Sequence, residues 1–236
     1  MRAVPAVLLF PLIPLSAFAQ GSASYSIDPQ QSKLEIHVGK EGAFKAFGHD
    51  HLIAARQVSG EVQFDSQKID KSSVRLQVPT KSITVIDPGE SEKDRKEVQA
   101  TMEGEKALDV AKFPKITFTS TSISTAKKSS DGWELTLSGN LNLHGVEKPV
   151  TFPLQVRAEN TDLHARGEVS ILQTDYGITP VKVGGGTVKV KDKVKITFNI
   201  VARRATNPQT QQPHECPNLR QGILKTRILG ERIRYK

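Results

Sequence analysis

Hydrophobic and polar residues alternate with a period of two along most of the chain between residues 24 and 204. The run WELTLSGNLNL, residues 133–143, shows the pattern most clearly, because one parity is apolar and the other is polar. The same alternation occurs in LEIHV, VRLQV, ITF, VTFPLQV and VKVKDKVKITFNI, the last with a break near Asp192. Successive side chains of a strand point to opposite faces, so the pattern predicts antiparallel strands with one dry and one wet face.

About eight such segments point to a closed up-and-down barrel or to a two-sheet sandwich. In a barrel of about eight strands, the inward side chains line an interior just wide enough to fill itself or to hold one small ligand. A packed sandwich core would show the same alternation. The pattern by itself therefore leaves an apolar container and a filled core both open.

One segment breaks the alternation, namely DPGESEKDRKEVQATMEGEKALD, residues 87–109. Asp87 is the predicted helix N-cap, Pro88 the first helical residue, and Glu90 completes a capping box three positions after the cap. Val98 and Met102 lie four residues apart and would share one face. We predict a mostly polar helical segment near residues 88–109, across the end of a sheet.

Both ends of the chain differ from this body. Residues 1–19 combine Arg2, a short apolar stretch and the small-x-small run Ala17-Phe18-Ala19, which predicts a signal peptide cleaved after Ala19. We therefore expect an exported, periplasmic protein. The basic tail, residues 205–236, lacks strand alternation and is expected to be disordered; a short amphipathic helix on an anionic membrane surface is the alternative.

Composition and the absence of known motifs argue against several classes of function. The net charge is +8, but the tail carries six lysines and arginines against two acidic residues, so the body is only weakly basic. No interleaving of basic and aromatic residues appears, and we expect no nucleic-acid partner. The single cysteine, Cys216, excludes an intrachain disulfide. None of the hydrolase, metalloprotease, phosphate-loop or dinucleotide motifs occurs, so we expect neither an enzyme nor a cofactor.

The run FGHDHLI, residues 47–53, holds the most distinctive chemistry. On a strand, His49 and His51 would share the dry side with Ile53, and Asp50 would face the other way. The pair can bind a ligand headgroup such as a quinone carbonyl at a barrel mouth, or it can serve packing alone, and both interpretations stay open. A metal-binding or redox role, or an enzyme using this pair, is the alternative function, although zinc needs three or four protein ligands.

Two other histidines are given structural roles. His144 lies in the turn Leu143-His144-Gly145-Val146 and is expected to cap backbone carbonyls. His37 has the wet parity, opposite Ile36 and Val38, and is expected to be exposed.

Several runs resemble the YceI-like family, the periplasmic lipocalin-like proteins associated with polyisoprenoid binding. They are YSIDPQQSKLEIHV at 25–38, ALDVAKFPKITFTSTSI at 107–123, LSGNLNLHGVEKPVTFPLQV at 137–156, TDYGITP at 174–180 and VKDKVKITFNIVA at 190–202. The resemblance implies an all-β fold: an eight-stranded antiparallel lipocalin-like barrel over residues 20–204 that encloses a long apolar tunnel. Typical members have one histidine in a less polar run after the first strand, so ligand contacts at His49 and His51 do not carry over from the family.

The resulting prediction is a binding or carrier protein for an isoprenoid or other long-chain amphiphilic lipid, quinone- or polyprenyl-like. His49 and His51 are placed at the polar mouth, no metal ligand is assigned, and a homodimer is left open. The residues predicted to line the apolar bore share the dry parity: Phe118, Trp133, Leu135, Leu137, Leu141, Phe152, Ile196 and Phe198.

Overall fold

The computed structural model describes residues 22–41, 50–183 and 188–205. Within these ranges the chain forms twelve strands, one α-helix and short 3₁₀ turns. The strands are β1 (Ala23–Ile27), β2 (Lys33–Glu41), β3 (His51–Ala55), β4 (Ser59–Phe64), β5 (Ser73–Pro79), β6 (Ile83–Val85), β7 (Lys115–Ser129), β8 (Gly132–Leu143), β9 (Val146–Glu159), β10 (Asp162–Leu172), β11 (Lys182–Val183) and β12 (Val188–Arg204). The helix is α1 (Glu92–Glu103), and the 3₁₀ turns are η2 (Ile69–Lys71), η3 (Thr80–Ser82) and η4 (Gln173–Tyr176).

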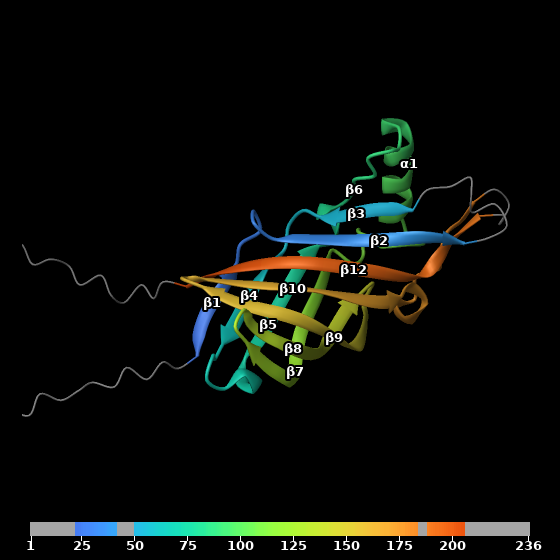
Figure 1. Ribbon diagram of the computed structural model, residues 1–236. Helices are drawn as coiled ribbons and strands as arrows, with labels where there is room; N and C mark the ends of the chain where they lie inside the picture. Colours follow the sequence, from blue (N-terminus) through green and yellow to red (C-terminus); the bar gives the residue numbers. More distant parts are fainter. Residues whose placement is uncertain (1–21, 42–49, 184–187, 206–236) are drawn as a thin grey trace, which may run out of the picture. The chain divides into compact units, whose positions relative to one another are not determined.

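The strands close into an eight-stranded antiparallel barrel (Figure 1). The ring runs β1-β4-β5-β7-β8-β9-β10-β12, and the pairing of Tyr25 with Arg204 joins β12 back to β1. The long strand β12 also pairs with β2, and β3 and β6 follow β2 in turn, so the wall continues beyond β1. This architecture confirms the predicted fold class.

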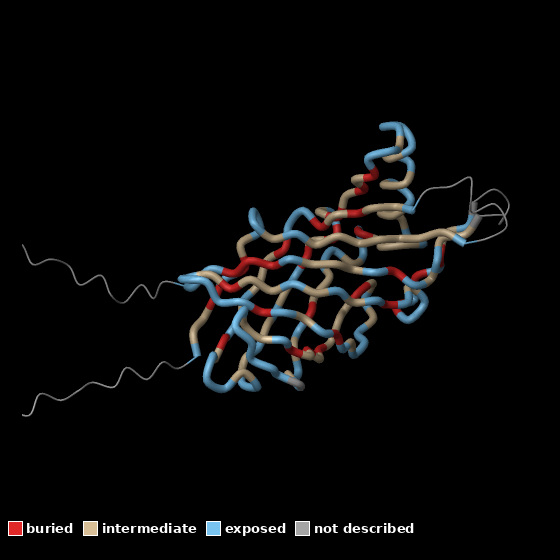
Figure 2. Tube along the Cα trace, viewed as in Figure 1, coloured by how far each residue is buried: buried red, intermediate tan, exposed pale blue. Residues whose placement is uncertain are grey.

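The two parities of the alternation correspond to the inner and outer faces of the barrel wall. Buried and exposed residues follow one another along the strands (Figure 2). In β8, Leu135 and Leu137 are buried whereas Glu134 is exposed. The break predicted near Asp192 is confirmed, because the register between β12 and β2 shifts between Val190 and Val194.

The core lies inside the barrel and is almost entirely apolar. Phe152 packs against Phe118 and Phe198, with ring centroids 5.7 Å apart in both pairs. Burying an aromatic side chain of this size contributes about 1.5–3 kcal/mol, and tilted or edge-on ring contacts add to it. Thr80 and Asp87 are the buried polar residues among those that the structure describes.

The helix is shorter than predicted, and its predicted cap is wrong. It spans Glu92–Glu103, and its N-cap is Ser91, whose Oγ accepts a hydrogen bond from the Asp94 backbone N–H at 3.2 Å. Asp87 does not cap the helix because its carboxylate accepts from the Leu52 N–H and bonds to His51 instead. The predicted polar character is confirmed, since no residue of α1 is buried.

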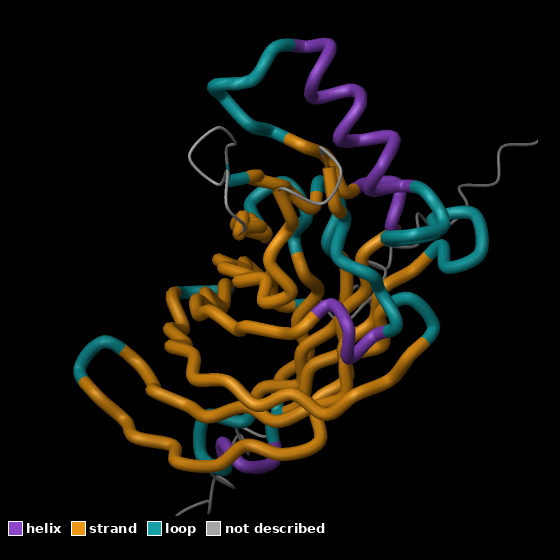
Figure 3. Tube along the Cα trace, turned by 90° about the vertical axis from the view of Figure 1, so that its right-hand side faces the viewer, coloured by secondary structure: helices purple, strands orange, loops and turns teal. Residues whose placement is uncertain are grey.

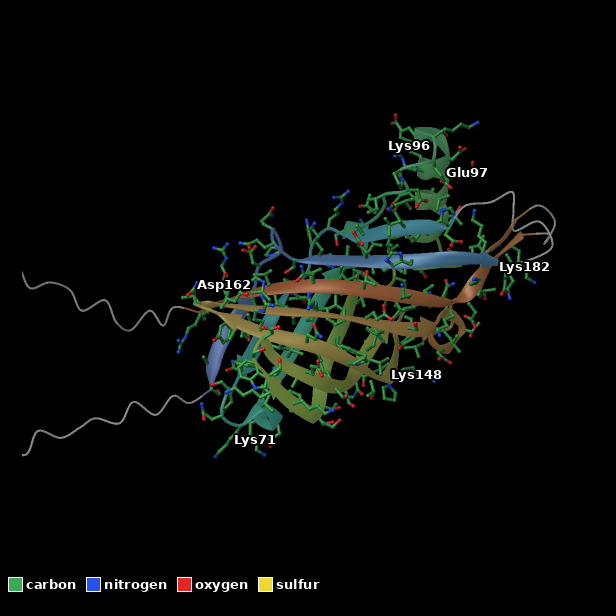
Figure 4. All side chains as sticks on the ribbon, viewed as in Figure 1. Lys71, Lys96, Glu97, Lys148, Asp162 and Lys182 are labelled. Carbon is green, nitrogen blue, oxygen red and sulfur yellow. The ribbon has the colours of Figure 1, made fainter. Side chains whose placement is uncertain are left out.

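Helix α1 stands beside β6 and β3 at one end of the barrel (Figure 1), and we call this the α1 end. Figure 3 views the strands from this side, with the helix next to the ring. The labelled side chains Lys96 and Glu97 project from α1 away from the strands, and Lys71 and Asp162 mark the other end of the barrel (Figure 4).

No helix in the described ranges is both long enough and apolar enough to cross a membrane. The predicted signal peptide and, apart from Ala205, the predicted tail fall outside the described residues.

Candidate functional site

An apolar cavity of about 310 Å³ occupies the inside of the barrel. Every strand of the eight-membered ring contributes side chains to its wall, as do β2, β3, β6 and Met102 of α1. Among the described lining residues, three have polar side chains: Ser72, Ser73 and Gln173. A long hydrocarbon would find an almost purely apolar surface there.

Seven of the eight residues predicted to line an apolar bore do line this cavity: Phe118, Leu135, Leu137, Leu141, Phe152, Ile196 and Phe198. Trp133 does not. Its ring packs edge-on against Phe64 at 5.2 Å, and the Lys128 ammonium lies 5.6 Å from the ring centroid. Parity places Trp133 on the inner face, but it is the second residue of β8 and therefore packs at the rim.

Several residues that line the cavity were not among those predicted, although the same period-two signal marks most of them. Leu34, Ile36 and Val38 alternate in β2, and all three line the cavity. Met102 of α1 and Leu108, in the turns after α1, also reach it. For these two residues the period-two signal gives no guidance, because their segment is not a strand.

A polar row borders the apolar wall at the α1 end. Ile36 pairs with Ile53, which pairs with Val85, and this row is apolar throughout. Two residues further along on the same face, Val38 of β2 pairs with His51 of β3. Asp87 lies two residues after Val85 and therefore has the same parity as Val85. His51 and Asp87 therefore extend the inner face of β3 and β6 past the last apolar row.

Asp87 is the centre of this polar row. Its side chain is only 5% exposed, and Oδ2 lies 2.7 Å from His51 Nδ1. The Leu52 backbone N–H donates to Oδ1, and the Arg95 guanidinium donates to the Asp87 carbonyl oxygen at 3.2 Å. A buried carboxylate needs such partners, because an unpaired one would be costly. The row thus ties the end of β6 to β3.

Two further charged side chains, Glu90 and Lys40, lie near His51 and Asp87. The Glu90 Oε1 lies 3.7 Å from His51 Nδ1, and its side chain is 11% exposed. Burial lowers the pKa of the Lys40 ammonium, and the carboxylates of Glu90, Asp50 and Asp87 partly oppose that shift. The α1 end therefore brings together carboxylates, an imidazole and an ammonium beside the apolar wall.

The remaining histidines have separate positions. His49 lies outside the described residues. His144 Nδ1 lies 3.1 Å from the Tyr176 carbonyl oxygen, which confirms the predicted carbonyl cap. The expectation for His37 is wrong: it is half-buried, and its Nε2 bonds to Thr197 Oγ1 at 3.2 Å, because Thr197 of β12 lies beside it. His164 pairs with Glu159 at 3.9 Å, at the far end of the barrel.

Comparison with known proteins identifies relatives in sequence and in fold. A family model described as YceI-like domain matches residues 25–202. Protein YceI from Salmonella newport (strain SL254) is 32% identical over 161 residues, which are 61% of this chain and 76% of that protein. The corresponding protein of Salmonella arizonae (strain ATCC BAA-731 / CDC346-86 / RSK2980) matches to the same extent.

Two solved structures share the fold. BcnA from Burkholderia cenocepacia superposes with a TM-score of 0.59 at 23% identity, over 76% of this chain and 99% of that one. A polyisoprenoid-binding domain from Saccharophagus degradans, implicated in plant cell wall breakdown, gives a TM-score of 0.55 at 15% identity, over 78% and 99%. Because the family match covers most of the chain and the barrel agrees with it, the protein belongs to the YceI-like domain family.

Proposed function

We propose that this protein is a periplasmic binding or carrier protein that encloses an isoprenoid or another long-chain amphiphile, quinone- or polyprenyl-like. The observation that carries the proposal is the apolar cavity inside the closed barrel, with three polar side chains on its described wall. Membership of the YceI-like family and the shared fold of a polyisoprenoid-binding domain support it.

The binding energy would come from burial of the chain. Each CH₂ group removed from water contributes about 0.8 kcal/mol. Association costs several kcal/mol in lost translational, rotational and chain freedom. A chain of a few isoprene units exceeds that cost, so affinities in the micromolar range follow without any specific polar contact.

The polar end of the amphiphile is assigned to the α1 end. His51 and Asp87 border the apolar wall there, and Gln173 lines the cavity. An amphiphile with its headgroup at this end would keep the hydrocarbon along the bore and the headgroup near polar partners. A contact between His51 and the headgroup stays a prediction, as does one from His49.

Export and assembly complete the proposal. The proposed route is export by the signal peptide of residues 1–19, with cleavage after Ala19. Contact of the tail with an anionic membrane surface and formation of a homodimer stay predictions.

A series of prenols tests the binding step. Farnesol, geranylgeraniol and solanesol are titrated against delipidated protein that holds a fluorescent apolar dye, and displacement of the dye is measured. The expected affinity rises with chain length until the cavity is filled and then levels off, because each added unit buries more apolar area. Affinity that is independent of chain length would contradict enclosure of the chain.

A further inference from the structure

Three metal-ligating side chains converge at the α1 end. The ligand atoms of His51, Asp87 and Glu90 all lie within 4.8 Å of one another. His51 Nδ1 is 2.7 Å from Asp87 Oδ2 and 3.7 Å from Glu90 Oε1. They come from three separate places: the first residue of β3, the second residue after β6, and the segment before α1. Three protein ligands are the number that an open zinc site typically takes.

The surroundings hold one of these ligands in place. The Leu52 N–H engages Asp87 Oδ1, which leaves Oδ2 directed to His51. Arg95 fixes the Asp87 backbone by donating to its carbonyl oxygen. Hydrogen bonds of this kind orient ligands around a metal and are part of the site's affinity.

A hydrogen-bonded clamp between β3 and β6 would need only His51 and Asp87. Glu90 adds a second carboxylate whose side chain is 11% exposed and whose oxygen lies within 4.8 Å of the Asp87 ligand atom. Two carboxylates in a partly desolvated place repel one another. A divalent cation between them removes that repulsion more effectively than the single charge of Lys40, whose ammonium senses both carboxylates.

We propose that His51, Asp87 and Glu90 bind a divalent transition metal ion, of the zinc class, at the α1 end of the barrel. One imidazole nitrogen with two carboxylate oxygens suits zinc and its neighbours, whereas magnesium and calcium take oxygen ligands. Three protein ligands leave a coordination position for water or another oxygen ligand. The site goes beyond the proposed lipid function and stands without it.

Calorimetric titration with Zn²⁺ tests the site. The whole mature chain is used with His214→Ala and Cys216→Ser, so that the imidazole and thiol of the tail contribute no heat. We expect one equivalent of Zn²⁺ to bind with micromolar or tighter affinity and no matching heat with Mg²⁺ or Ca²⁺. Loss of an outer-shell partner typically costs 10–100-fold in affinity, so His51→Gln and Glu90→Gln are expected to weaken binding by at least about 100-fold.

His164→Gln is the matched control, because it removes an imidazole that also faces a glutamate, at 3.9 Å, but lies far from the α1 end. Circular dichroism tests whether each variant is folded. If His51→Gln does not fold, the Zn²⁺ affinity of Glu90→Gln tests the proposal. Two further readouts report on the ligands directly: the visible absorption of Co²⁺ bound at the site, and the change in the ¹⁵N shifts of the His51 ring when Zn²⁺ is added. If His51 and Asp87 formed only a structural hydrogen bond, added metal would produce neither signal.

Absence of stoichiometric Zn²⁺ binding would overturn the proposal, and so would Zn²⁺ affinity unchanged in folded Glu90→Gln. Zn²⁺ binding in a protein that shows no prenol binding would leave this site intact and remove only the lipid function.

Discussion

Leu137→Arg is expected to abolish the binding of long prenols, with a loss of affinity of more than about 100-fold. Leu137 is 5% exposed and lines the cavity. An arginine there would place a charge in an almost purely apolar space, where an unpaired charge costs several kcal/mol, and a loss of 2.7 kcal/mol already corresponds to 100-fold. Dye displacement by solanesol measures the effect.

Leu172→Arg is the matched control, because the same substitution falls on an apolar residue that is 41% exposed on β10. It is expected to leave prenol binding unchanged. Should Leu137→Arg fail to fold, Leu141→Trp fills part of the same cavity without adding charge and is expected to shorten the longest prenol accepted. Wild-type affinity in both folded cavity variants would show that prenols bind elsewhere.

Asp87→Ala is expected to lower the free energy of unfolding by about 2–4 kcal/mol. The substitution leaves the Leu52 N–H without its acceptor and removes a bond to His51, and hydrogen bonds to buried charged groups are among the strongest. Asp87→Asn keeps an acceptor for Leu52 and is expected to lose less. Urea unfolding, followed through Trp133 fluorescence in the presence of a chelator, measures both.

Asp70→Ala provides the comparison for Asp87→Ala. Asp70 is exposed, and its ion pair with Lys71 is at the surface, so the change is expected to stay within about 0.5 kcal/mol. Equal stability of Asp87→Ala and Asp70→Ala would show that Asp87 does not tie β6 to β3.

The strands were predictable because a period of two is a local signal. Residues 133–143 read as a strand with Leu135 and Leu137 inward, and β8 shows this arrangement. Closure is a different matter. Closure depends on the pairing of Tyr25 with Arg204, two residues that are distant in the chain. The local alternation is the same in a closed barrel and in a two-sheet sandwich, so it does not predict this pairing. The family resemblance, and not the alternation, separated the two architectures.

The error at the helix cap arose because long-range contacts compete with local signals. Asp87 followed by Pro88 has the form of a helix start, yet the Leu52 N–H and His51 take its carboxylate, and the helix begins after Ser91. The parity of Asp87 with Ile83 and Val85 was visible in the sequence and would have placed it on the inner face. Trp133 shows the limit of parity, because facing inward does not tell how deep a residue lies.

Native mass spectrometry of the protein purified from its native host tests the central claim most directly, when it is followed by organic extraction and identification of the released molecule. We predict one discrete adduct, carried in equal amount with the protein, that fragments as a prenyl or quinone compound. A protein that carries no lipid, and that gains none when long prenols are added, would contradict enclosure of an amphiphile in the barrel.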